Sequence, residues 1–579
     1  MDNEGTLVDF NSSEDKQTSQ SKTCKQCGQD FVIEKEDLEF YKKISPKFAG
    51  KIYEIPAPNH CPNCRLQKRL AYRHGGKFFS RTCDLSSKPI ISMYSPKKPF
   101  KVYEHDEWWS DKWDALSFGK DFDFSRPFFD QLNELFEVVP HASLANINAE
   151  NSYYCNMALN SKNCYLLTGA SNNENCMYGY FITSCKDTVD SGSLTKCQFC
   201  YEGLTSSDCY NCKFFANSRS CSDCFVIEDC QSCQNCIGCF GLRNKQYYIY
   251  NENVGKQKYE EFVANNLAPI THDKIDKIKS QFNKIKMKLP HRQSYIYASE
   301  NCSGDMVLNS KNCHYAFASK EGEDSKFIFS DPKAQHSYDC SFASPVGTQY
   351  SYYTISTLGT SMLFTWFHWY GDEGLFTMEC HNCDNCFACV GLRRKQYCIF
   401  NKQYTKEEYE KLAGKIIEHM QETDEWGEFY PMKHSMHSYD ESLANDFFPL
   451  DKDSAKKAGF EWSDYVPPKP NISKIIKSNE VPEDINHTDN SIVNMAIECE
   501  VTGWPFMITP NEFAFYKQTG LPIPRKHPEQ RHKERMAIRN AIQLWNRKCQ
   551  NCQKDIKSIY KPDRKEIVFC ETCYQKSIL

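Results

Sequence analysis

The chain has 579 residues, which at about 150 residues per domain leaves room for roughly four domains. The hydrophobic fraction of 40% and the charged fraction of 25% are those of a globular protein. The net charge of −5 excludes a global positive field that would attract nucleic acid or anionic lipid, so any such binding needs a local patch.

The first residues, Met1 to Gly5, carry acid where a signal peptide carries base, and the most apolar stretch, residues 361–370, is too short to cross a bilayer. We therefore expect a cytoplasmic protein without membrane contact. Its 32 cysteines should then be reduced, and should bind metal or be buried as small side chains. A secreted disulfide protein is the competing class. Residues 1–22 are polar and acidic without periodicity, which predicts a disordered tail.

Residues 23–145 are predicted to form an N-terminal zinc-ribbon module. Two Cys-x2-Cys pairs, Cys24/Cys27 and Cys61/Cys64, are the ligand pattern of a structural zinc site. Gly28 eases the turn after the first pair, and Pro62 stiffens the second. A further pair has decayed, because Cys83 is followed by Ser86, Glu104 and Glu107 at the remaining ligand positions. We expect no tight zinc binding there.

The segment from Cys24-Lys25-Gln26-Cys27-Gly28 to His60-Cys61-Pro62-Asn63-Cys64-Arg65 resembles the probable treble-clef zinc-ribbon domain of bacteria. The longer layout is similar to large bacterial proteins in which such ribbons flank cysteine-rich repeats. The resemblance implies structural zinc but carries no established activity. Such proteins are sometimes named CaiB/BaiF-type CoA-transferases, a name that no residues here support.

Residues 146–263 contain a short repeat. Cys185, Cys197, Cys209, Cys221 and Cys233 are twelve residues apart, and a second series of cysteines follows three residues behind most of them. A unit this short must stack on its neighbours, so we predict a parallel β-solenoid whose coil holds one or two units. A helix is expected at Lys256–Ala264.

Residues 264–291 read as a charged helical linker, and residues 292–420 as a second solenoid copy with a trailing helix at Lys406–His419. The run from Asn160 to Cys164 recurs as Asn309 to Cys313, and the run from Cys236 to Tyr247 recurs as Cys386 to Tyr397. Residues 421–490 are expected to form an extended linker.

Each solenoid copy also holds four cysteines spaced by threes, which are Cys230, Cys233, Cys236 and Cys239 in the first copy and Cys380, Cys383, Cys386 and Cys389 in the second. Three interpretations remain open. These tetrads form an inward ladder of small side chains, bind zinc or another thiophilic metal, or bind an iron–sulfur cluster.

Residues 491–579 are predicted to form a C-terminal zinc-ribbon module. Its Cys549-x2-Cys552-x17-Cys570-x2-Cys573 spacing lies within the usual zinc-ribbon range. The two ends of the chain align: Cys499 and His527 match Cys24 and Cys61, whereas Thr502 and Gln530 replace the other two ligands. We therefore expect about two zinc ions per chain, one at each intact site.

A row of arginines follows the central cysteine pair of each module at a spacing of four residues, which places each row on one helical face. The rows are Arg65, Arg69 and Arg73 in the first module and Arg531, Arg535 and Arg539 in the second. Either they contact nucleic-acid phosphates, or they pair with carboxylates or carbonyls of their own module, which the weakly acidic composition favours.

The favoured fold class is mainly β, a duplicated cysteine-rich parallel β-solenoid flanked by duplicated α+β zinc-ribbon modules. The favoured function is a non-enzymatic interaction scaffold with a protein partner. A nucleic-acid-binding zinc-ribbon protein and an enzyme, either redox-active or a CoA-transferase by name alone, remain as alternatives. No residues are predicted to be catalytic.

Overall fold

The computed structural model describes residues 19–343, 346–466, 472 and 474–578. Most of the predicted disordered tail, residues 1–18, lies outside this range. The rest of that segment is ordered, because Gln20–Thr23 forms strand β1, which pairs with β2. No helix in the described part of the chain is long and apolar enough to cross a membrane.

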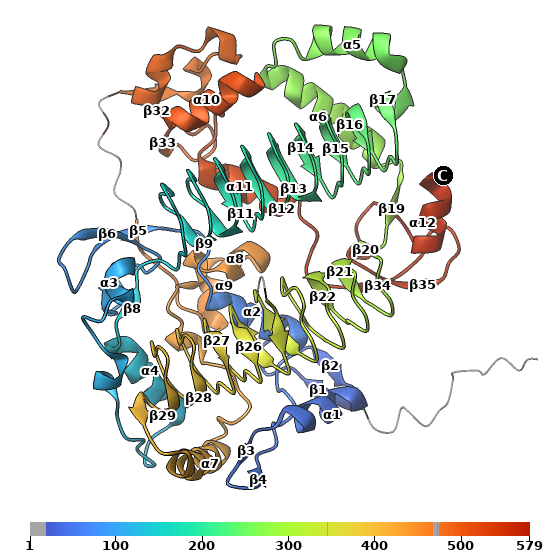
Figure 1. The fold of residues 1–579 in the computed structure, drawn as a ribbon. Helices are drawn as coiled ribbons and strands as arrows, with labels where there is room; N and C mark the ends of the chain where they lie inside the picture. Colours follow the sequence, from blue (N-terminus) through green and yellow to red (C-terminus); the bar gives the residue numbers. More distant parts are fainter. Residues whose placement is uncertain (1–18, 344–345, 467–471, 473, 579) are drawn as a thin grey trace, which may run out of the picture.

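The middle of the chain forms two stacks of short strands (Figure 1). The first coiled stack is a ten-stranded sheet in which successive strands pair in parallel, except that β18 is antiparallel to β17. Its strands are β9 (Asn156–Leu159), β10 (Thr168–Ser171), β11 (Met177–Tyr180), β12 (Val189–Thr195), β13 (Tyr201–Ser207), β14 (Lys213–Ala216), β15 (Phe225–Glu228), β16 (Gln234–Phe240), β17 (Gln246–Ile249) and β18 (Glu252–Asn253).

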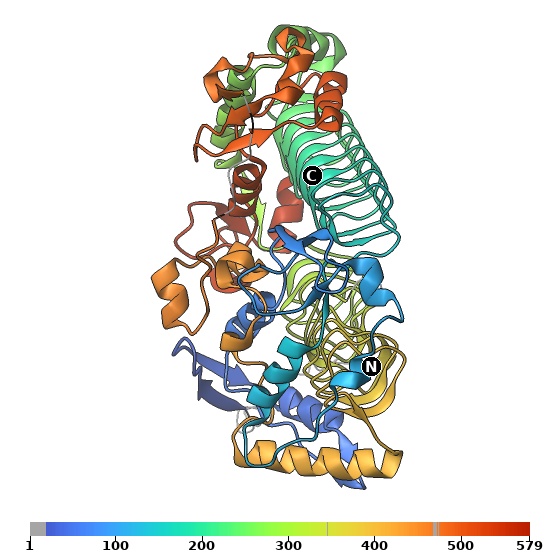
Figure 2. The same cartoon turned by 90° about the vertical axis from the view of Figure 1, so that its left-hand side faces the viewer.

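Each winding of the first coiled stack holds one twelve-residue unit. Partners across every parallel pair differ by twelve residues, as in Thr168 with Asn156 and Phe225 with Ile237. Figure 2 shows these windings as closely layered loops. The twelve-residue period of the cysteines is therefore the length of one coil.

A three-residue pattern underlies each coil. Every third residue has left-handed backbone, for example Asn163 at φ 54°, Asn175 at φ 53° and Asp223 at φ 53°. Asn and Asp tolerate this conformation because their short polar side chains bond locally. The next residue points inward and is buried, as Cys164 and Cys224 are at 2% exposure. Most of the inward apolar side chains are cysteines, and a minority are larger residues such as Leu167 and Phe215.

The second coiled stack is less regular. Its partners differ by twelve residues at Asp384–Gln396, by eleven at Ile296–Val307 and by fourteen at Tyr338–Tyr352. Its strands are β20 (Ile296–Tyr297), β21 (Gly304–Leu308), β22 (Ala316–Lys320), β23 (Tyr338–Ser341), β24 (Thr348–Gln349), β25 (Tyr352–Ile355), β26 (Leu358–Thr360), β27 (Trp369–Asp372), β28 (Asp384–Phe387), β29 (Gln396–Ile399) and β30 (Lys402–Gln403). Together the two stacks confirm a β-rich fold with a large mixed sheet.

Helices close the stacks. The two predicted trailing helices are confirmed as α5 (Gly255–Asn266) and α7 (Lys406–Glu422), and the charged linker contains α6 (His272–Lys286), followed by strand β19 (Pro290–Arg292). The second prediction of a linker, residues 421–490, needs correction. Its described part carries α8 (Leu443–Phe447), α9 (Lys452–Lys457) and β31 (Ile475–Lys477), and the α8 side chain Leu443 is fully buried.

The N-terminal module contains three hairpins, β1–β2, β3–β4 and β5–β6. Its elements are β1 (Gln20–Thr23), β2 (Asp30–Ile33), α1 (Lys35–Ile44), β3 (Lys47–Phe48), β4 (Lys51–Ile52), α2 (Pro62–Ala71), β5 (Phe79–Thr82), β6 (Pro89–Ser92), β7 (Val102–Tyr103), α3 (His105–Trp109), the 3-10 helix η2 (Ala115–Phe118), α4 (Phe128–Val138) and β8 (His141–Ala142).

The C-terminal module repeats the order of hairpin, helix, helix, hairpin and helix that runs from β1 to α3, without the β3–β4 hairpin. Its elements are β32 (Ala496–Glu498), β33 (Pro505–Met507), α10 (Pro510–Thr519), α11 (Pro528–Ala537), β34 (Trp545–Lys548), β35 (Asp555–Ser558), β36 (Ile567–Phe569) and α12 (Glu571–Ile578). This order agrees with the duplication read from the sequence.

Each end module packs a helix on the stack that is farther from it in the sequence, and it also contacts the nearer stack, as Asn540 does with Asp305 and His74 with Asn156. Helix α2 of the N-terminal module packs on β23 and β25 of the second coiled stack, and α11 of the C-terminal module packs on β12 of the first (Figure 1). The helices that precede the stacks cross over in the same way. Phe128 of α4 contacts Phe387 of the second stack, whereas α6 packs on β15 and β16 of the first.

Candidate metal centres

The first candidate centre joins the β1–β2 hairpin to the start of α2. The Sγ atoms of Cys24, Cys27, Cys61 and Cys64 all lie within 4.8 Å of one another, and Cys27 Sγ is 3.7 Å from Cys61 Sγ. Cys61 is the N-cap of α2, so Cys64 stands in the first turn. Three of the thiols are buried and Cys27 is exposed. The arrangement could hold a metal ion.

The second candidate centre has the same construction at the other end of the chain. Cys549 and Cys552 come from the β34–β35 hairpin, and Cys570 directly precedes α12, whose first turn holds Cys573. Their four Sγ atoms also lie within 4.8 Å of one another, with Cys552 Sγ 3.8 Å from Cys570 Sγ. Both four-cysteine groups predicted from the sequence are therefore assembled in the structure.

Backbone hydrogen bonds shape the turn that presents the first two thiols. The N–H of Gly28 donates to the carbonyl of Cys24 at 3.0 Å, and the N–H of Cys24 donates to the carbonyl of Gln29 at 2.9 Å. Gly28 has φ 71°, which explains why glycine follows the second cysteine. At the other centre Gln553 takes the same left-handed conformation, with φ 62°.

The two decayed sites keep the fold of this turn. Ser87 and Gly503 donate to the carbonyls of Cys83 and Cys499, both at 2.9 Å, as Gly28 does to Cys24. Cys83 Sγ accepts from the backbone N–H of Glu104 at 3.2 Å, much as Cys24 Sγ accepts from that of Cys61 at 3.3 Å. The same hairpin-and-helix unit therefore occurs four times. Two of the copies, those of Cys83 and Cys499, keep this fold although they lack the four cysteines.

At each intact centre the surroundings lower the pKa of one thiol, whereas burial raises the pKa of Cys27 and Cys570. A hydrogen bond from Cys64 is the main cause that lowers the pKa of Cys61 to about 5. Burial opposes ionisation of Cys549, but the backbone N–H groups of Cys552 and Cys570 lower its pKa to about 6. Thiolates are the form that binds metal, and a helix N-terminus stabilises them.

The interior tetrads differ from these centres. Their eight side chains are at most 1% exposed, and each thiol donates to the carbonyl two residues earlier, as Cys236 does to Gln234 at 3.4 Å and Cys386 to Asp384 at 3.4 Å. Burial raises the pKa of the Cys230 and Cys380 thiols. Within the described residues, only the two terminal groups bring three or more Cys, His, Asp or Glu ligand atoms within 4.8 Å of one another.

The arginines of α2 are buried against the second coiled stack. Arg65 Nε lies 2.9 Å from Asp339 Oδ2, and Arg69 Nη1 lies 2.8 Å from Asp339 Oδ1. Both side chains are at most 2% exposed. Arg73 reaches Ser356 and lies over the Phe342 ring at 3.9 Å, and burial lowers its pKa to about 9.

The arginines of α11 repeat this arrangement on the first coiled stack. Arg531 and Arg535 both pair with the buried Asp190, and Arg531 also lies 3.3 Å from Glu512. Arg539 is half-buried and lies over the Phe447 ring at 3.5 Å. The third arginine of each row therefore packs on an aromatic ring.

These contacts weigh against phosphate binding by the arginine rows and correct one detail of the favoured internal pairing. Phosphate contact needs solvent-facing guanidinium groups, and five of the six are buried. The carboxylates do not come from the arginines' own module alone, because Asp339 and Asp190 belong to the stacks. Neither aspartate was predicted as a partner of the arginines. A signal was present, since each stands 26 residues after the matching cysteine, Cys313 or Cys164, of the duplicated run.

Comparison of the chain with models of protein families finds no match, and comparison with curated proteins finds none either.

Proposed function

We propose that the chain is a zinc-stabilised interaction scaffold, a duplicated parallel β-solenoid flanked by zinc-ribbon modules of the treble-clef type. The observation that carries the proposal is the position of the two four-cysteine groups. Each stands at the first turn of a helix, α2 or α12, that docks on a coiled stack. A metal ion at each site would therefore fix the start of a helix that packs on a coiled stack.

Zinc is the metal that best fits these groups. Four thiolates in a tetrahedron with Zn–S bonds of about 2.3 Å lie about 3.8 Å apart along each edge. One S–S separation in each group, 3.7 Å or 3.8 Å, agrees with that value, and the other thiols lie within 4.8 Å. All-cysteine tetrahedral sites are structural, because no coordination position is left for water or substrate.

Helix α12 is anchored as α2 is. Tyr574 of α12 donates a hydrogen bond from its hydroxyl to the buried Asp229 of the first coiled stack. Glu571, at the start of α12, pairs with Arg292 at 2.8 Å. A cysteine-bound metal at the beginning of each helix would fix the direction in which these side chains reach the stack.

The metal content of the purified protein tests this proposal. We expect about two zinc ions per chain by elemental analysis. The double substitution Cys549→Ser/Cys552→Ser should remove one zinc ion and lower the free energy of unfolding, because structural zinc supplies folding free energy on the order of 10 kcal/mol. The matched control is Cys83→Ser/Cys499→Ser, which changes the decayed turns and should leave the zinc content unchanged.

Two outcomes would contradict the zinc proposal. One is wild-type protein that folds and contains no zinc. The other is a Cys549→Ser/Cys552→Ser variant that retains full zinc content. Of the six candidate arginines of the nucleic-acid alternative, four form internal ion pairs and two pack on aromatic rings. We therefore expect the same preparation to bind RNA and DNA no more tightly than an acidic control protein.

A further inference from the structure

The outer ends of the two coiled stacks are equivalent, so they can be compared residue by residue. Ile249, Tyr250 and Asn251 close the first stack, and Ile399, Phe400 and Asn401 close the second at the same place. Asn251 and Asn401 cap the last coil alike: each accepts from a backbone N–H, of Phe240 or Val390, at 2.8 Å.

The helices that pack beside these ends are equivalent too. The run Gln131-Leu132-Asn133 of α4 recurs as Gln281-Phe282-Asn283 of α6, and Pro140-His141 recurs as Pro290-His291. Helix α4 lies on the second stack and α6 on the first. Whatever covers the second end therefore shows what the first end is built to receive.

Residues 115–123, the covering segment, close the end of the second stack. The Lys120 N–H donates to the carbonyl of Phe400 at 3.0 Å, and Asn401 donates to the carbonyl of Ala115 at 3.0 Å. The Phe122 ring packs 5.5 Å from the Phe400 ring. As a result Phe400 and Asn401 are fully buried.

The side chain of Gln131 holds the far end of the covering segment by its backbone. Its amide oxygen accepts from the Asp123 N–H at 2.9 Å, and its amide nitrogen donates to the Asp123 carbonyl at 2.9 Å. At the rim, Lys402 pairs with Asp121 at 2.7 Å. The segment is thus bound through its main chain, one aromatic ring and one charge.

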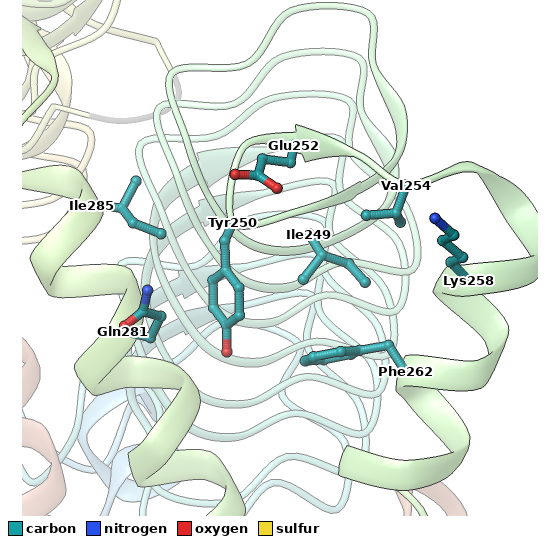
Figure 3. Close-up of a pocket in the computed structure, with 8 residues that line it drawn as sticks. All are labelled: Ile249, Tyr250, Glu252, Val254, Lys258, Phe262, Gln281 and Ile285. Carbon is teal, nitrogen blue, oxygen red and sulfur yellow. The ribbon is translucent and has the colours of Figure 1, made fainter.

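The end of the first stack has a cleft of about 450 Å³ in the equivalent position. Figure 3 shows Ile249 and Tyr250 of the last coil at its centre, with Gln281 and Ile285 of α6 on one side and Phe262 of α5 on the other. Tyr250 is half-exposed and Gln281 is exposed, whereas their counterparts Phe400 and Gln131 are at most 1% exposed.

We propose that this cleft binds an extended segment of a partner protein that carries an aromatic residue directly after a basic one. The aromatic ring takes the place of Phe122, against Tyr250, Phe262 and Ile285. The Gln281 amide holds the segment's backbone as Gln131 holds Asp123. The partner residue before the aromatic one is basic for reasons of charge. Glu252 stands where the second stack has Lys402, so the residue at the position of Asp121 faces a negative charge in place of a positive one.

This inference rests on the proposed scaffold function, because it names the chemistry of a scaffold partner. The probe is the peptide of residues 116–125 of this chain carrying Asp121→Lys, with binding to the full-length protein measured by calorimetry. We expect this peptide to bind about fivefold more tightly than the unchanged peptide, the effect of one rim charge pair. Adding Phe122→Ala to the peptide should weaken binding at least about tenfold, because the ring is no longer buried.

Charge reversal in the protein locates the binding. The Glu252→Lys protein should prefer the unchanged, acidic peptide. The matched control Glu260→Lys, on the same cap but outside the cleft, should keep the preference of the wild type. Equal binding of both peptides by the Glu252→Lys protein, or no measurable binding by folded wild type, would overturn the proposal.

Two further measurements distinguish a failure of the cleft proposal from a failure of the scaffold proposal. Sedimentation of the protein alone shows whether a second copy fills the cleft, and a dimer that Glu252→Lys dissociates would replace the peptide by self-association. Zinc content and melting are measured on the same samples. Full zinc and normal melting without peptide binding would reject the cleft alone, whereas a zinc-free folded protein would reject the scaffold proposal.

Discussion

At the scale of single residues, Asp339 and Asp190 connect the end modules to the stacks. A carboxylate that is completely removed from water is costly unless it is paired, and each of these aspartates faces two guanidinium groups. The left-handed backbone places them there: Asp339 has φ 55° and Asp190 has φ 53°. Aspartate is one of the few residues that suits both the conformation and the charge.

Removing the charge of either aspartate should therefore destabilise the protein strongly. We expect Asp339→Asn to lower the free energy of unfolding by about 3–5 kcal/mol, because two buried guanidinium groups lose their carboxylate. Asp190→Asn should have a similar effect. Asp208→Asn is the matched control, since Asp208 has the same backbone conformation but is exposed. Denaturant unfolding measures all three, and an Asp339→Asn protein as stable as the control would contradict this account.

The two four-cysteine groups were predictable from sequence because the spacing within each pair is local. Cys549 and Cys552 share one turn, and Cys570 and Cys573 share another, so four residues already define the site. The partners of the arginines were not predictable in this way. Arg65 and Asp339 lie 274 positions apart in the chain, and helical spacing shows only that the arginines share a face, not what the face meets.

At the scale of elements, the three-residue pattern determines which side chains are tolerated. In the first coiled stack a residue with left-handed backbone is followed by an inward residue and then by an extended one, as in Asn163, Cys164 and Tyr165. The Asn side chains also connect neighbouring coils, because Asn163 donates to Asn175 at 3.3 Å and Asn175 donates to Asp187 at 2.9 Å.

The conformation, more than the hydrogen-bond ladder, should dominate the effect of substitutions at these positions. We expect Asn163→Val to lower the free energy of unfolding by about 1–3 kcal/mol, because a β-branched residue is strained in the left-handed region. Asn163→Gly should cost less, since glycine adopts that conformation freely. Lys162→Val is the control at an exposed, extended position of the same coil. If Asn163→Val and Lys162→Val melt alike, the backbone argument is wrong.

The twelve-residue period and the trailing helices followed from sequence because the cysteines and the helical pattern repeat, but the sequence left open whether a coil holds one such unit or two. The irregular windings of the second coiled stack could not be predicted from the sequence. There Ser337, Ser351 and Met362 stand where the first stack mostly has cysteines, so no period marks the eleven- and fourteen-residue windings. The helices α8 and α9 were not predicted either, because they are too short to show a clear helical periodicity.

At the scale of the whole molecule, the chain is interlocked. Helices α2 and α4 of the N-terminal module precede the first stack but pack on the second. Helix α6 and helices of the C-terminal module pack on the first. Strand β19, which leads into the second stack, pairs with β36 of the C-terminal module. Both duplications are visible in the sequence, but this exchange is not, because repeated units with equivalent surfaces are compatible with either pairing.

The exchange predicts that the molecule survives a cut between its two halves. A protease recognition sequence can be placed in the exposed connection between α5 and α6, at Ala268 and Pro269. After cleavage each fragment contains the module that clamps the stack of the other fragment, through Asp339 on one side and Asp190 on the other. We expect the two fragments to elute together at the size of the intact chain until a denaturant separates them.

The buried aspartates provide the matched control for this cleavage. In Asp190→Asn/Asp339→Asn protein the arginines of both docking helices lose their partners, so the cleaved fragments should separate at a lower denaturant concentration than those of the wild type. Each docking interface also keeps the two fragments together at the other interface. The double substitution should therefore lower the stability of the cleaved complex by more than the sum of the two single substitutions. Wild-type fragments that separate immediately on cleavage, without denaturant, would show that the stacks and modules are held by the covalent chain and not by the reciprocal docking.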